Sequence, residues 1–183
     1  MEEFVQTRRN WLSCLCAGLV GMAMVAGAGA ADGPAKAIAV RVVTKATYDK
    51  IIASNKGKVV VVDCWATWCV PCRKAFPKTV EMSKAYANKG VVVVSLSFDE
   101  TVKGQVSDKV KDFLVSQDAH FENLVSALDI SDDGAEVFGI PDGALPHFKI
   151  YGKDGKLFKS FGGDNEFTHE DIEAAVEAAL KVK

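Results

Sequence analysis

Two cysteines separated by two residues are the most reactive arrangement in this chain. Cys69 and Cys72 enclose Val70 and Pro71, directly after an apolar run and at the start of a helical pattern. A sulfur in the first turn of a helix lies near unpaired backbone N–H groups, which favour the thiolate. A thiolate attacks a disulfide, and a second thiol one turn later can release the product. The spacing therefore predicts a redox-active pair, with Cys69 as the nucleophile and Cys72 as the resolving thiol.

A structural zinc site is the alternative for such a pair, and it needs four ligands. Beyond the N-terminal segment the chain offers one other cysteine and three histidines, none at a paired ligand spacing: Cys64, His120, His147 and His169. Cys64 lies in an apolar run and is typical of a buried core thiol. We therefore expect no metal site, and no cofactor besides the redox-active disulfide Cys69–Cys72.

Alternating strands and helices must position the pair. Apolar runs at 58–65 and 91–98 each contain four consecutive valines, which is typical of strands covered on both faces of a sheet. A helical pattern follows the pair from about 70 to 88. Upstream, 38–43 predicts another strand and 48–54 a short helix. The order to this point is β-α-β-α-β.

The C-terminal part predicts a hairpin and a closing helix. Residues 147–151 alternate with period two, an Asp-Gly turn follows, and 157–161 provides the partner strand. Thr168 is the expected N-cap of the last helix. Between 99 and 141 the pattern is less regular, with a helix at 109–116, a loop at 131–134 and a helical turn at 135–138.

The first thirty residues have the pattern of an export signal. Arg8 and Arg9 precede an apolar stretch that ends in the small residues Ala28-Gly29-Ala30. The arginine pair fits either the Sec or the twin-arginine route. The stretch is also long enough to remain as a membrane anchor. We predict a signal or anchor at 1–30 and one folded domain at 31–183.

Composition excludes several classes of protein. Of the 183 residues 49% are hydrophobic, which excludes a disordered chain. The 22 Lys and Arg nearly balance the 24 Asp and Glu, and no basic stripe occurs, so nucleic acid is not an expected partner. A multipass membrane protein is excluded because the sequence has a single long apolar run.

The segment from Val62 to Lys74, V-D-C-W-A-T-W-C-V-P-C-R-K, resembles the active-site segment of the thioredoxin superfamily, and most closely its exported TlpA/ResA branch. Pro77 matches the kink proline of that family, and Leu145-Pro146 resembles its cis-proline segment. The long stretch at about 100–138 is similar to the insertion of the TlpA/ResA branch. The resemblance implies a thioredoxin-like α/β fold: a mixed central sheet with a parallel β-α-β-α-β half and a C-terminal antiparallel hairpin, and helices on both faces.

The resemblance also implies roles around the pair. Pro146 would be the cis-proline that lies beside the sulfurs and shapes the substrate groove. Asp63 would match a buried acid that accepts a proton from Cys72; the alternative is a strand-end residue that faces solvent. The rest of the active-site environment would comprise Trp68, Val70, Pro71, Leu145 and His147.

Two positions depart from the family pattern. Ser95 stands roughly where thioredoxin carries a lysine near the acid, so the proton affinity of Asp63 is expected to be set differently. His147 follows the proline where relatives usually have threonine. It either contacts substrate or titrates near Cys69, or it is an ordinary surface residue at the start of a strand. The redox potential and the substrate stay open.

The resemblance implies an exported thiol–disulfide oxidoreductase, in the periplasm or on the outer face of the membrane. It would exchange electrons with protein disulfides as a reductant fed by a membrane electron donor, a role often tied in this branch to cytochrome c biogenesis. The alternative is a copper-binding metallochaperone of the same fold that uses Cys69, Cys72 and His147, because thiolates and imidazole suit Cu(I). No methionine cluster accompanies the pair, which disfavours that alternative.

Overall fold

The computed structural model describes residues 37–163 and 166–182. Its strands are β1 (Val40–Val43), β2 (Val59–Trp65), β3 (Val91–Ser97), β4 (Glu122–Ser126), β5 (His147–Tyr151) and β6 (Leu157–Phe161). Its helices are α1 (Lys45–Ser54), α2 (Val70–Ala85), α3 (Asp108–Ser116), α4 (Asp132–Val137) and α5 (His169–Lys181), with a 3₁₀ turn η1 at Pro141–Gly143. No helix in this described part has the length and hydropathy to cross a bilayer, and the predicted signal or anchor lies outside it.

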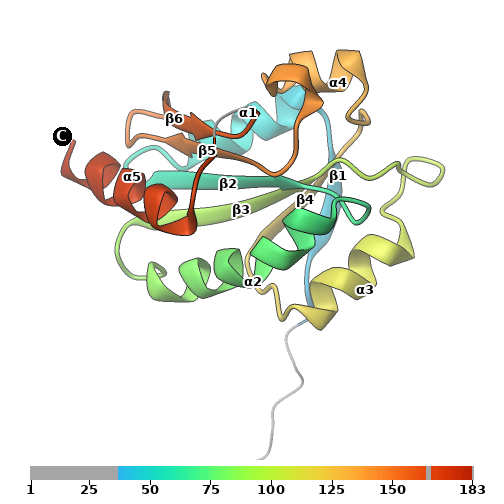
Figure 1. Ribbon diagram of the computed structural model, residues 1–183, viewed down its shortest axis with the longest axis horizontal. Coiled ribbons are helices and arrows are strands. Elements are labelled where there is room, and N and C mark those ends of the chain that lie inside the picture. Colours follow the sequence, from blue (N-terminus) through green and yellow to red (C-terminus); the bar gives the residue numbers. More distant parts are fainter. Residues whose placement is uncertain (1–36, 164–165, 183) are drawn as a thin grey trace, which may run out of the picture. The chain divides into compact units, whose positions relative to one another are not determined.

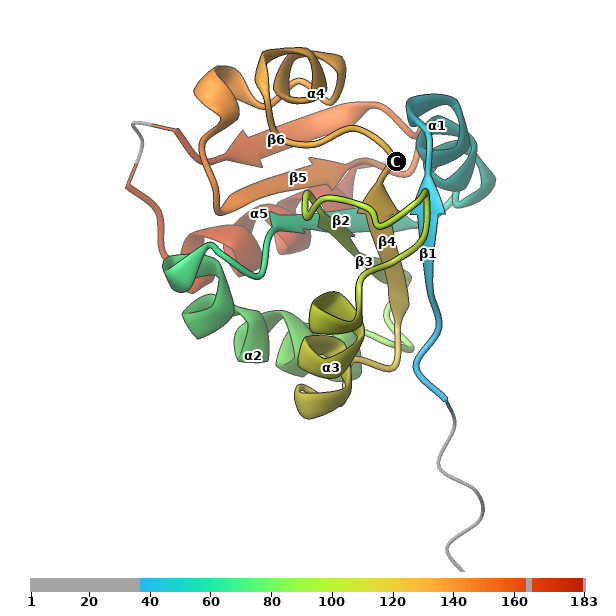
Figure 2. The ribbon, with the colours of Figure 1, turned by 90° about the vertical axis from the view of Figure 1, so that its right-hand side faces the viewer.

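The six strands form one mixed sheet in the order β1-β4-β3-β2-β5-β6 (Figures 1 and 2). The first four in this order run parallel, whereas β5 is antiparallel to β2 and β6 is antiparallel to β5. Every residue of the central strand β2 is buried, as its valine run predicts. The predicted mixed sheet with a C-terminal hairpin is confirmed.

The two faces of the sheet have separate apolar cores. Alternation along β2 directs Val59 and Val61 to the face covered by α2 and α5, and Val60 and Val62 to the opposite face, where α1 packs. Beside the first core, Trp65 packs with Phe76 of α2 and with buried residues of α3. Figure 1 shows α2, α3 and α5 on one side of the sheet and α1 and α4 on the other. The carboxyl end of β2, where the redox pair begins, is therefore supported on both faces.

Strand β4 was not predicted from the sequence. It lies between β1 and β3, in the stretch where no strand is predicted. Polar Asn123 interrupts the apolar pattern, yet it is buried because its amide is satisfied: Nδ2 donates to the carbonyls of Ala119 (2.8 Å) and Phe121 (2.9 Å), and Oδ1 accepts from Ser95 (2.9 Å). A hydrogen-bonded side chain can thus take an interior position that composition alone assigns to a loop.

Helix boundaries also differ from the sequence pattern. The predicted loop at 131–134 is wrong, because α4 begins at Asp132. Gly134 belongs to that helix: an added Cβ there would lie 1.7 Å from the Asp129 carbonyl oxygen, so only glycine permits this approach. Helix α1 begins at Lys45, where Thr44 caps it, instead of at Tyr48. Helix α5 has the predicted Thr168 cap, completed by Asp171 as a capping box.

Candidate active site

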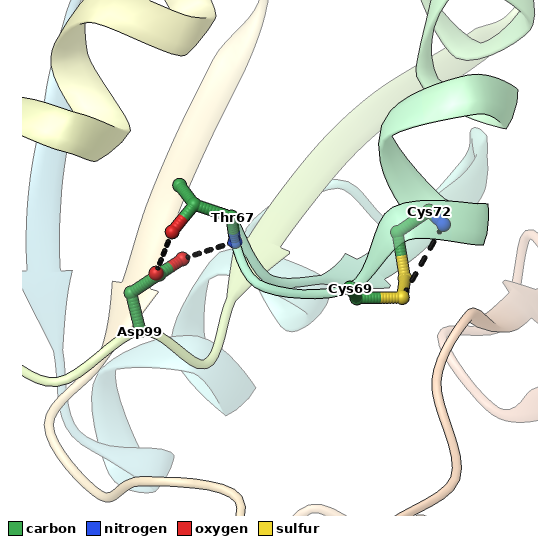
Figure 3. The surroundings of a disulfide bond; sticks show 4 residues. All are labelled: Thr67, Cys69, Cys72 and Asp99. Carbon is green, nitrogen blue, oxygen red and sulfur yellow. Dashed lines mark hydrogen bonds between the residues drawn. A yellow bond between two sulfur atoms is a disulfide. The ribbon is translucent and has the colours of Figure 1, made fainter.

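Cys69 and Cys72 form a disulfide at the start of α2, with an S–S distance of 1.96 Å (Figure 3). Cys69 is the N-cap residue, and its Sγ accepts a hydrogen bond from the backbone N–H of Cys72 at 3.3 Å. The sulfur occupies the place where a serine or aspartate oxygen usually caps a helix. After reduction, the same N–H group and the N-terminal end of the helix would stabilise a thiolate on Cys69. The arrangement suits the predicted nucleophile.

Exposed apolar side chains surround the nearly buried sulfurs. Cys69 is 6% exposed, whereas Trp68 is 55% and Val70 is 50% exposed. The Leu145-Pro146 peptide bond is cis, and Leu145 packs against the cluster that contains both cysteines. Pro71 and Pro146 line one end of a groove of about 790 Å³ that continues toward α5. The structure thus places Pro71, Leu145 and Pro146 of the predicted environment near the pair, and Trp68 and Val70 flank Cys69 along the chain.

The turn that carries Cys69 is anchored by Asp99, which sequence reasoning missed. The Asp99 carboxylate accepts hydrogen bonds from the backbone N–H of Thr67 (2.8 Å) and from the Thr67 hydroxyl, as Figure 3 shows. It also accepts from the hydroxyl of Ser97 (2.8 Å). Cys69 in turn donates its N–H to the Ala66 carbonyl (3.1 Å). The sequence held one signal for this contact. Strands β2 and β3 are parallel neighbours, so their carboxyl ends lie at the same edge of the sheet, and a polar residue just after β3 lies close to the turn after β2.

Asp63 is a buried acid in the middle of the sheet. It is 2% exposed, so the alternative of a solvent-facing residue is wrong. Its Oδ2 accepts a hydrogen bond from the hydroxyl of Thr79 on α2, at 2.6 Å. Burial raises the pKa of Asp63 from 3.8 to about 7, while the bond from Thr79 acts in the lowering direction. The carboxyl group therefore titrates in the neutral range, where a proton acceptor is most useful.

His147 is neither a surface residue nor a group that titrates near neutral pH. It is 2% exposed and pairs in register with Cys64, on the face of the sheet opposite to Asp63. Burial lowers the pKa of His147 to about 4, so the imidazole is neutral at pH 7. Neither ring nitrogen has a hydrogen-bond partner among the described residues. The expectation of a surface position is therefore wrong.

Comparison with known proteins places the chain in a family. The Redoxin family model matches residues 36–177. The chain belongs to the Redoxin family. It is 34% identical over 119 residues to a thiol-disulfide oxidoreductase ResA of Bacillus cereus, a match that covers 64% of this chain and 61% of that protein. The chain thus spans about three fifths of the length of the curated relatives it matches.

Solved structures agree with this placement of the Redoxin chain. A putative thiol:disulfide interchange protein DsbE from Chlorobium tepidum is 27% identical, with a TM-score of 0.58 over 70% of this chain and 84% of that one. A thioredoxin family protein from Chlorobium tepidum TLS is 25% identical, with a TM-score of 0.53 over 70% and 83% of the two chains. The predicted thioredoxin-like fold and the resemblance to the TlpA/ResA branch are confirmed.

The third cysteine of this Redoxin domain is structural. Cys64 is a free thiol that is 1% exposed, and burial raises its pKa to about 12 even though Lys149 lies near enough to oppose the shift. Lys149 is itself buried, and its Nζ donates to the carbonyl of Phe138. No group of three or more His, Cys, Asp or Glu side chains suited to a metal ion occurs in residues 37–163 and 166–182. The core role predicted for Cys64 is confirmed.

Gly162 supports the cis-proline segment of this Redoxin domain, and its replacement should be costly. It adopts φ +137°, and an added Cβ would lie 2.5 Å from His147 Nδ1 and 3.0 Å from the Pro146 carbonyl oxygen. We expect Gly162→Ala to lower the free energy of unfolding by roughly 3 kcal/mol, from backbone strain plus overlap with the His147 ring and the Pro146 carbonyl.

Gly163→Ala is the matched control, because Gly163 also has a positive φ (+68°) but no atom of the described residues within 4 Å of the added Cβ. It should cost only about 1 kcal/mol. Urea unfolding of the wild type and both variants measures the difference. Equal losses of the free energy of unfolding in the two variants would show that overlap with Pro146 and His147 does not contribute to the effect.

Proposed function

We propose that this protein is a thiol–disulfide oxidoreductase that exchanges electrons with disulfides of other proteins through Cys69 and Cys72. The observation that carries the proposal is the position of Cys69 as the N-cap of α2, with its sulfur on a backbone N–H and exposed apolar side chains beside it. The similarity to ResA and to the DsbE structure supports the same activity.

In the reducing direction, the Cys69 thiolate attacks one sulfur of the substrate disulfide and displaces the other as a thiolate. The product is a mixed disulfide between Cys69 and the substrate. Cys72 then loses its proton to Asp63 and attacks the Cys69 sulfur, which releases the second substrate thiolate. Two electrons have passed to the substrate, and the Cys69–Cys72 disulfide remains. The pair carries the electrons itself, so the cycle needs only a dithiol donor and no bound cofactor.

The direction of electron flow and the location belong to this proposal as well. The signal pattern in residues 1–30 supports an extracytoplasmic location, in the periplasm or on the outer face of the membrane. A reductant in such an oxidising compartment needs electrons from across the membrane, so we propose a membrane protein as its donor. Cytochrome c biogenesis is the process that the TlpA/ResA resemblance favours for the substrate.

Equilibration with glutathione buffers tests the direction. We expect a potential nearer to about −270 mV, as in thioredoxin, than to about −120 mV, as in the oxidant DsbA. Insulin reduction by the full chain tests the activity, and N-terminal sequencing of the protein from its native cell tests export. Stoichiometric Cu(I) binding by the reduced protein, without any reduction of protein disulfides, would favour the metallochaperone instead.

A further inference from the structure

The contact between Asp63 and Thr79 is isolated from solvent. Asp63 is 2% and Thr79 is 0% exposed, and the hydroxyl of Thr79 lies 2.6 Å from Asp63 Oδ2. Thr79 follows Cys72 on α2 by about two helical turns, so both side chains face the sheet from the same side of the helix. One helix thus carries the resolving thiol and a hydrogen-bond donor to the acid.

The other elements around Asp63 offer its carboxyl group no competing partner. On β3, its register partner Ser95 donates to Asn123 instead (2.9 Å). On β5 the register partner is Phe148, and α5 contributes apolar residues such as Ile172 to the core on this face. Cys64 is adjacent along β2 but lies on the opposite face. Within the described residues, Thr79 is therefore the polar side chain that holds Asp63.

We infer that Thr79 is a positioning residue for the redox reaction: its hydroxyl fixes the Asp63 carboxylate and sets how readily that group takes the proton of Cys72. This inference rests on the proposed function. In the step, the proton moves from the Cys72 thiol to Asp63, and Thr79 keeps its own proton while it donates to the carboxylate.

The direction of the effect follows from the charge on the acceptor. A donor bound to a carboxylate stabilises the ionised form, so the bond from Thr79 opposes the rise that burial causes in the pKa of Asp63. Removing the hydroxyl should therefore raise that pKa further, by roughly one unit or tenfold in proton affinity. More of the protein would then hold a protonated acid at pH 7, which cannot accept a proton.

Carbon-13 NMR of the Asp63 carboxyl in the oxidised full chain measures this directly. Thr79→Val keeps the shape of the side chain and removes the donor, so the titration should move upward by that tenfold factor. Thr79→Ser keeps a hydroxyl and should restore the wild-type midpoint. Ser83→Ala is the matched control, because this hydroxyl on the same helix donates to the Val80 carbonyl and not to Asp63. If Thr79→Val does not fold, Thr79→Ala gives the same readout.

The second readout is the pH profile of the step in which Cys72 releases the mixed disulfide. This profile should move upward with the Asp63 titration in Thr79→Val, while alkylation of Cys69 keeps its wild-type profile. An unchanged Asp63 titration overturns the inference, and so does a shifted titration with an unshifted release profile. If the wild type reduces no protein disulfide, the proposed function fails, and the titration still decides whether Thr79 controls the acid.

Discussion

Replacing Cys72 with alanine should leave the protein covalently attached to its substrates. The Cys69 sulfur keeps its position at the N-cap of α2 and can still attack a disulfide. The thiol that would break the resulting bond is gone, so mixed disulfides should accumulate and turnover should stop. Non-reducing gels and mass spectrometry of Cys72→Ala isolated from its native compartment measure the adduct and identify the substrate.

Two further variants separate the roles of the cysteines. Cys69→Ala should trap little, because Cys72 is 2% exposed and lies inside the helix. Cys64→Ala is the matched control: it removes a buried thiol outside the pair and should leave turnover intact. If Cys72→Ala carries no covalent partner and the wild type reduces no protein disulfide, the oxidoreductase proposal is wrong. The copper-binding alternative would then take its place.

Asp63→Asn should make the protein more stable above pH 7 and slower in turnover. The folded protein holds the Asp63 proton more tightly than the unfolded chain does, because burial raises the pKa from 3.8 to about 7. This contribution to stability is complete below about pH 4, declines as the pH rises through the window between the two values, and is lost above pH 7. Its full size is about 4 kcal/mol for a shift of this extent.

Asparagine carries no charge at any pH and can still accept the hydrogen bond from Thr79. The stability of the Asp63→Asn variant should therefore lack the decline that the wild type shows as the pH rises. Urea unfolding of the oxidised wild type and Asp63→Asn, from pH 4 to pH 9, measures the difference. The two stability curves should diverge between about pH 4 and pH 7 and keep a constant difference above pH 7. Parallel curves would mean that the carboxyl group is not buried as the structure has it. The variant should still form mixed disulfides through Cys69, because only proton transfer at Cys72 is affected.

Much of this site was predictable because local sequence determines it. A cysteine pair after a valine-rich strand and before a helix can hardly lie elsewhere than at the N-terminus of that helix. The hydrogen bonds from Thr79 to Asp63 and from Thr67 to Asp99 were not predictable, since they depend on how α2 and β3 are placed against β2. The burial of His147 was unpredictable for the same reason: His147 pairs with Cys64 of β2, and the chain returns close to its ring at Gly162.

Cys64 gives the protein an internal probe of local unfolding. It lies in one core cluster with residues of α1 and with Phe138 and Ile140, which follow α4. When the redox pair is oxidised, Cys64 is the free thiol of the described part of the chain, and it is 1% exposed. A thiol reagent can reach it only while that layer separates from the sheet. The labelling rate at Cys64, assigned by peptide mapping, should therefore measure how often this face opens, independently of the chemistry of the redox pair.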